Sequence, residues 1–214
     1  MPNVLSHVRF FDLSEATGTR YESLLDSIDG WTKTIVGNAT IVLGAGELTI
    51  SGGTTAGAYA DLNRFVSYGH WQPTFDKKRV IKTALEFAFK DTGSNGNFFG
   101  TGFLPLANNG FGFQIKSNGL YGYVEGALGR SEVPIHIGFI GTWLQYWLLE
   151  ATLFPMSRVQ FKASDGVDTY IQNLYTNLPA GDDDSGKPLS FKVSQGAALT
   201  HVLLTSSLLF FQDT

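Results

Sequence analysis

The densest group of possible metal ligands is the run Asp182-Asp183-Asp184, which lies in the glycine-bounded segment Gly181–Gly186. Calcium takes about six to eight oxygen ligands, and carboxylates in a flexible loop supply several of them. The three aspartates are adjacent, however, and lack the alternating spacing that turns successive carboxylates toward one point. The run is therefore either a calcium site or an acidic loop exposed to solvent, and calcium is the one cofactor that the sequence suggests.

A second candidate site is the segment Tyr68-Gly69-His70-Trp71, which is followed by Gln72-Pro73. Its Gly and Pro predict a loop. An indole ring in a loop combines a flat apolar surface with a polar N–H group, so Trp71, with Tyr68 and His70 beside it, is our candidate for contact with a ligand or partner. Five other aromatic residues are expected to pack in the core unless they prove exposed: Trp31, Trp143, Trp147, Tyr121 and Tyr123.

The residues that catalysis needs are scattered along the chain. No Gly-x-Ser-x-Gly motif is present, and the four histidines lie in different segments: His7, His70, His136 and His201. Retaining glycoside hydrolysis needs two carboxyl groups about 5–5.5 Å apart, whereas Glu86 and Glu150 stand singly in segments of alternating polarity. We therefore expect a protein that is not an enzyme.

Alternation of apolar and polar residues predicts the strands that must position these sites. In Val80–Lys90, Ile81 and Leu85 fall on one face and Lys82 and Glu86 on the other. The last strand is expected from His201 to Gln212.

Two pairs of strands are joined by turn sequences that predict hairpins. Asn118-Gly119 separates the alternating segment Phe111–Lys116 from Leu120–Glu125. Asp165-Gly166 follows the segment Arg158–Lys162 in the same way. Asn-Gly and Asp-Gly readily adopt the positive φ angles of tight hairpin turns, so both pairs are predicted to be antiparallel.

Few stretches have a helical period, and the best helix candidate is Ser14–Asp29. The short strands and frequent glycines predict an all-β, antiparallel two-sheet sandwich. We expect residues 31–214 to form this domain and residues 1–30 to form an N-terminal arm or a first strand.

Composition narrows the classes of partner. The chain has 214 residues, no cysteine, 16% charged residues and a net charge of −4. Nucleic-acid binding needs many convergent cations, so it is disfavoured. A hydrophobic content of 43% with so few charges suggests that another subunit covers part of the surface, which predicts a homo-oligomer. Neither a secretory signal nor an apolar run of membrane-spanning length is visible, so membrane insertion is not expected.

Several segments, in order, resemble the concanavalin A-like lectin/glucanase jelly rolls of the kind found in bacteriophage and other viral structural proteins. They are Ala39–Val42, Gly46–Gly53, Phe98–Phe103, Gly110–Phe113, Trp147–Leu153, Ser157–Phe161, Asp165-Gly166 and Thr176–Pro179. The resemblance covers residues 31–212 and implies a jelly-roll sandwich. It also implies that the small residues of Phe98–Phe103 and Gly110–Phe113 let the two sheets approach closely.

Two enzyme patterns known on this fold find little support. The glucanase pattern E-x-D-x-x-E is absent. Arg130-Ser131-Glu132-Val133 and Ile135-His136-Ile137 resemble fragments of alginate lyases. In those enzymes the fragments lie on separate strands, whereas here they nearly abut.

Two functional hypotheses follow. The resemblance implies a non-enzymatic virion structural protein, such as a capsid decoration, head-fibre or tail-associated protein, that contacts its own copies and other virion proteins. The alternative is a carbohydrate-binding module or lectin for adhesion, located outside the cell or at its surface, with Trp71 and the acidic loop near a glycan.

Overall fold

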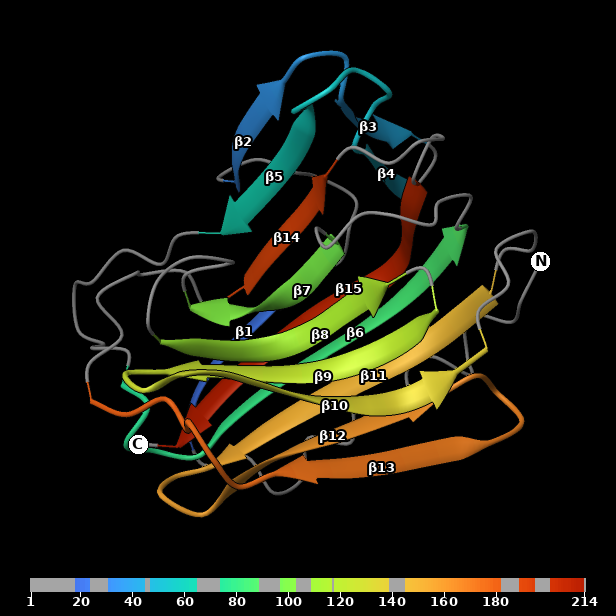
Figure 1. The fold of residues 1–214 in the computed structure, drawn as a ribbon. Helices are drawn as coiled ribbons and strands as arrows, with labels where there is room; N and C mark the ends of the chain where they lie inside the picture. Colours follow the sequence, from blue (N-terminus) through green and yellow to red (C-terminus); the bar gives the residue numbers. More distant parts are fainter. Residues whose placement is uncertain are drawn as a thin grey trace.

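The computed structural model is an antiparallel β sandwich of two sheets (Figure 1). The structure describes residues 18–23, 31–44, 47–64, 74–88, 97–102, 109–116, 118–138, 145–181, 189–194 and 201–213. No helix able to cross a membrane occurs among these residues. The all-β class and the two-sheet sandwich that the alternation predicts are confirmed.

The larger sheet has eight strands, of which β1 (Gly18–Ser23) pairs with β15 outside the main path. The main path runs in the order β13 (Thr169–Leu174), β12 (Arg158–Ser164), β11 (Gln145–Phe154), β6 (Arg79–Ala88), β15 (His201–Asp213), β4 (Glu47–Ser51) and β3 (Thr40–Gly44).

The smaller sheet has seven strands and faces the larger one (Figure 1). Its order is β10 (Gly129–Ile137), β9 (Gly119–Gly126), β8 (Gly110–Lys116), β7 (Asn97–Gly102), β14 (Leu189–Ser194), β5 (Tyr59–Arg64) and β2 (Trp31–Val36). The chain crosses between the sheets several times, so strands distant in sequence become neighbours.

Both predicted hairpins are confirmed. Strands β8 and β9 pair with Lys116 opposite Gly119, and β12 and β13 pair with Ser164 opposite Thr169. In the second turn, Asp165 Oδ1 accepts hydrogen bonds from the N–H groups of Val167 and Asp168, at 2.9 and 2.7 Å. These bonds favour the ionised carboxylate and hold the pKa of Asp165 below its usual range.

Ser14–Asp29, the best helix candidate in the sequence, is not helical where the structure describes it. Gly18–Ser23 is strand β1, and it pairs with β15 from Leu208 to Asp213. Helix propensity is a weak prior that tertiary pairing overrides. Residues 14–17 and 24–29 lie outside the described residues.

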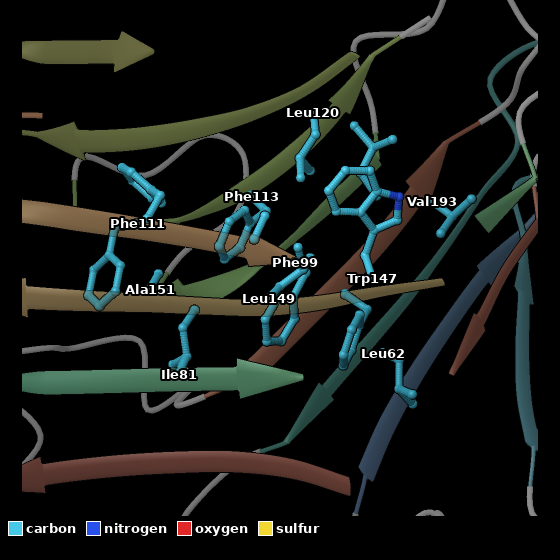
Figure 2. Packing of buried hydrophobic residues seen from close by; sticks show 14 of the residues in the cluster. Leu62, Ile81, Phe99, Phe111, Phe113, Leu120, Trp147, Leu149, Ala151 and Val193 are labelled. Atoms are coloured by element: carbon cyan, nitrogen blue, oxygen red, sulfur yellow. The ribbon is translucent and has the colours of Figure 1, made fainter. Parts of the chain in front are cut away.

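Aromatic rings from both sheets fill the core (Figure 2). Phe99 on β7 stacks on Phe191 of β14 at 4.8 Å between centroids, and Phe113 on β8 meets Phe161 of β12 edge to face at 5.6 Å. The indole of Trp147, only 1% exposed, lies among them. This confirms the expected packing role of Trp147, and Trp31 is likewise buried.

The glycines expected to bring the sheets together face the other way. Gly100 and Gly112 pair across β7 and β8, and a Cβ on Gly100 would lie 2.7 Å from the hydroxyl of Tyr123. They therefore make room for Tyr123 on the outer face of the smaller sheet. Gly122 on β9 has the expected role instead, because a Cβ there would meet the Phe161 ring at 2.4 Å.

We predict that Gly122→Ala destabilises the fold by about 1–3 kcal/mol, because the added methyl must displace a packed ring rather than a flexible chain end. The matched control is Gly44→Ala on β3, where no atom lies within 4 Å of the added Cβ. That variant is expected to stay within about 0.5 kcal/mol of the parent. Urea unfolding measures both; equal losses in the two variants would contradict the close approach at Gly122.

Candidate functional site

The two segments that the sequence singles out for binding begin and end at neighbouring points of the fold. Residues 65–73 and 182–188, which contain Tyr68, His70, Trp71 and Asp182–Asp184, lie outside the described residues. Their flanking residues are described. Arg64, which precedes the first segment, pairs with Leu189, which follows the second, in the register of β5 and β14.

The other two flanks are joined by hydrogen bonds. The N–H of Phe75 donates to the carbonyl of Gly181 at 2.7 Å, and the hydroxyl of Thr74 donates to the same oxygen at 3.1 Å. In return, the N–H of Gly181 donates to Asp76 Oδ1 at 2.8 Å. We call the set Arg64, Thr74–Asp76, Gly181 and Leu189 the loop junction.

Arg79, a residue of the larger sheet, links the loop junction to both sheets. The buried guanidinium of Arg79, on β6, donates to the Thr74 carbonyl and to the Thr101 hydroxyl of β7, each at 3.0 Å. It also lies 4.2 Å from the centre of the Phe75 ring. A cation over a ring face is attracted by the ring quadrupole, so Arg79 fixes Thr74 and Phe75 to both sheets at once.

A side-chain amide holds the second segment next to the junction. Asn109 donates from Nδ2 to the Ala180 carbonyl at 2.9 Å and accepts the Ala180 N–H at 3.1 Å. Sequence reasoning missed Asn109, Asp76 and Arg79. The Asn-Asn-Gly sequence around Asn109 predicts a loop, but nothing local indicates a partner 71 residues away.

The described tyrosines of the outer face are engaged in packing. The ring of Tyr121 lies 4.5 Å from Lys116 Nζ, and its hydroxyl accepts from Asn118 at 2.9 Å. Tyr123 is buried under Arg130, whose guanidinium lies 4.7 Å from the ring centre. Trp143 lies outside the described residues.

The two fragments that resemble alginate lyases face opposite sides of β10. Arg130 lies on the outer face, where it donates to Gln114 and pairs with Glu132 at 2.8 Å. His136 packs inward, with its ring 5.4 Å from Trp147 and 5.0 Å from Tyr170. An irregularity between Pro134 and His136 shifts the alternation of the strand, so the arginine and histidine do not face one substrate.

Two of the described glutamates are held in ion pairs with neighbouring cations. Glu150 pairs with Lys82 at 2.8 Å across β11 and β6, and Glu132 binds both Arg130 and Lys116. The described part of the chain holds no cluster of three His, Cys, Asp or Glu residues suited to a metal. The calcium hypothesis therefore concerns Asp182–Asp184 and stays a prediction.

Glu125 on β9 lies opposite Gly110, next in sequence to Asn109. Its Oε2 is buried without a hydrogen-bond partner. Burial raises the pKa of Glu125 above its ordinary value, and the positive charge of Arg130 offsets this only in part.

Comparisons with known proteins identify similar folds but no family. No family model matches the chain, and no curated protein matches its sequence. A protein of unknown function from Shewanella oneidensis superposes with a TM-score of 0.60 at 12% identity, over 100% of this chain and 97% of that one. Arcelin-5, a lectin-like defense protein from Phaseolus vulgaris, gives 0.61 at 10% identity, over 93% and 100%.

A third similar structure, botulinum neurotoxin type C, has a TM-score of 0.55 at 10% identity. The match covers 86% of this chain but 44% of the toxin chain, so the chain spans less than half of it. Together these similarities define the fold as a jelly-roll-type, lectin-like β sandwich, compatible with the concanavalin A-like resemblance.

We predict that Glu125→Gln raises stability at pH 7 and flattens its pH dependence. The folded-state pKa of Glu125 lies above the ordinary value of 4.5, so between the two values the folded state binds more protons. Stability of the parent should then fall as pH rises through that window. Urea midpoints of parent and variant at pH 3.5, 5 and 7 test this. A variant that is less stable by the same amount at all three would contradict it.

Proposed function

We propose that this domain is a non-enzymatic glycan-binding module whose site is formed by residues 65–73 and 182–188, the two segments whose flanks meet at the loop junction. The observation that carries the proposal is the junction itself. It joins the flanks of an aromatic segment and an acidic segment that lie more than a hundred residues apart, as the 105-residue separation of Asp76 and Gly181 illustrates. The junction therefore fixes the ends of both segments at one place in the fold.

The residue types of the two segments complement each other for sugar recognition. The flat ring of Trp71 can stack on the apolar face of a pyranose, with Tyr68 and His70 beside it to offer polar groups. Carboxylates of Asp182–Asp184 can accept hydrogen bonds from sugar hydroxyls, either directly or through a calcium ion that they hold. Orientation by a few polar groups around an apolar surface is the usual design of a ligand site.

The similar structures support the proposal at the level of the fold. Arcelin-5 is described as lectin-like, and cell entry of botulinum neurotoxin type C depends on two ganglioside molecules. A related toxin binding domain is in complex with SialylT. A jelly-roll sandwich is therefore a scaffold on which glycan sites occur, and we carry this over to the present chain as a proposal because fold alone does not set function.

The absence of an enzymatic role is part of the proposal. Its support is that the described candidates have structural partners: Arg130 and Glu132 bind each other, His136 packs in the sandwich, and Glu150 pairs with Lys82. A virion structural role stays a prediction. It is compatible with glycan binding, because a virion protein can also hold surface sugars.

We predict that Trp71→Ala weakens glycan binding at least about tenfold, because a stacked aromatic ring loses its buried apolar area. A glycan array with the parent chain identifies a ligand, and calorimetry then compares parent and variant. Val42→Ala is the matched control, since Val42 is an exposed apolar residue (56%) outside the junction. An array without any hit, or equal affinity of Trp71→Ala and the parent, would overturn the proposal.

The role of the acidic segment is tested with the same ligand. Asp182→Asn combined with Asp184→Asn is expected to weaken binding at least about tenfold, because amides replace charged acceptors. Chelation of calcium separates the two mechanisms. Loss of binding in EDTA that calcium restores indicates a bound ion, whereas unchanged binding indicates direct contact with the sugar. Full affinity in the double variant would remove Asp182–Asp184 from the site.

A further inference from the structure

Strand β13 forms one edge of the larger sheet, and its outer edge has no paired strand among the described residues (Figure 1). Exposed strand edges present unpaired N–H and C=O groups that attract another strand, and proteins protect them with charges, prolines and bulges. The neighbouring edge strand β10 carries such protection in Arg130, Glu132, Pro134 and the register shift after Pro134. Strand β13 has no charged residue, no proline and no register shift.

The sequence of β13, Thr-Tyr-Ile-Gln-Asn-Leu, contains no charge and no proline. Its register with β12 is continuous from Thr169 to Leu174, so no bulge twists the edge away. Tyr170 and Leu174 pack against the core, which leaves Ile171 on the outer face with 52% of its surface exposed. The strand is therefore regular and uncharged, and its outward-facing residues are Ile171 with Thr169 and Asn173 on either side.

Exposed apolar residues around β13 recur at equal spacing. Val167 is 90% exposed, Ile171 52% and Tyr175 66%. Val167 lies just before the strand and Tyr175 just after it, so each is four residues from Ile171. This spacing is symmetric about Ile171.

We propose that β13 pairs with β13 of a second copy of this chain, antiparallel and with a two-fold axis at Ile171. Residues directly opposite in an antiparallel pair share a face. The axis places the two Ile171 side chains opposite each other and Thr169 opposite Asn173. Val167 and Tyr175, which lie before and after the strand, then flank the paired segment. The two larger sheets then form one continuous sheet.

Charge is compatible with this pairing. The acidic residues near the strand are Asp165 and Asp168, both before its first residue. In the proposed register Asp168, next to the strand, lies level with Leu174 of the second copy, so no like charges meet along the paired strands. A two-fold interface must be complementary to itself, and the symmetric spacing of the apolar residues meets that condition. An unrelated extended peptide would not require it.

The first test is the mass in solution, measured by light scattering behind a sizing column. We expect twice the 23.3 kDa of one chain. Ile171→Lys places two like charges directly opposite each other and should raise the dissociation constant at least about tenfold. The matched control is Val42→Lys, because Val42 is similarly exposed (56%) on β3, at the opposite edge of the same sheet. A monomeric parent, or a dimer unaffected by Ile171→Lys, would overturn the proposal.

The second test uses the absence of cysteine in this chain. Ile171→Cys puts a single thiol at the proposed axis, where opposed Cβ atoms come within roughly 4.5–5.5 Å. Mild oxidation should then convert most of the protein to a disulfide-linked dimer, while Val42→Cys under the same conditions should stay mainly unlinked. Equal linking of the two variants would place the interface elsewhere. Neither experiment depends on glycan binding, so a failure of the dimer proposal can be distinguished from a failure of the proposed function.

Discussion

The buried guanidinium of Arg79 fixes the part of the sandwich on which the candidate site depends. It joins β6 to the hydroxyl of Thr101 on β7 and to the carbonyl of Thr74, and it lies over the Phe75 ring. A buried charge is costly unless it is hydrogen-bonded, and removal of a partner leaves that cost uncompensated. The two sheets and the start of the junction are therefore held in one arrangement, from which residues 65–73 and 182–188 depart.

The inner face of the smaller sheet packs in the core, whereas its outer face carries polar contacts. Inward residues such as Phe113 meet the larger sheet edge to face, and Gly122 admits the Phe161 ring. The outer side of β8 to β10 is covered by its own side chains, with Arg130 over Tyr123 and bound to Glu132. Arg130, Tyr123 and Glu132 are thus engaged with one another. The proposed glycan site is assigned instead to residues 65–73 and 182–188, because segments between strands commonly carry function.

Local patterns predicted the local parts of this fold. Asn118-Gly119 and Asp165-Gly166 specify their hairpins because the turn residues and the flanking alternation act within a few positions. Pairings between segments that are distant in the chain have no local sequence signal of this kind. Nothing around Asn109 points to Ala180, and nothing in Gly18–Ser23 reveals its pairing with β15. The sequence likewise did not predict that the His136 side chain packs inward, because this depends on an irregularity in the pairing of β10 with β9. For the candidate site, the sequence supplied the residue types, whereas the adjacency of the flanks had to come from the structure.

The two proposals together constrain how such a protein would engage glycans. Four residues lie opposite one another across neighbouring strands of the larger sheet: Arg79 on β6, Leu153 on β11, Val159 on β12 and Leu174 on β13. The loop junction is therefore at the end of the sheet toward which β13 runs. In an antiparallel pair of β13 strands these ends point in opposite directions. Avidity requires that both sites reach the same surface, and it is lost when geometry prevents this. A dimer joined at Ile171 would therefore bind a flat surface with one site at a time and leave the other free to hold a second surface. Its geometry suits bridging two glycan-bearing bodies rather than tight adhesion to one.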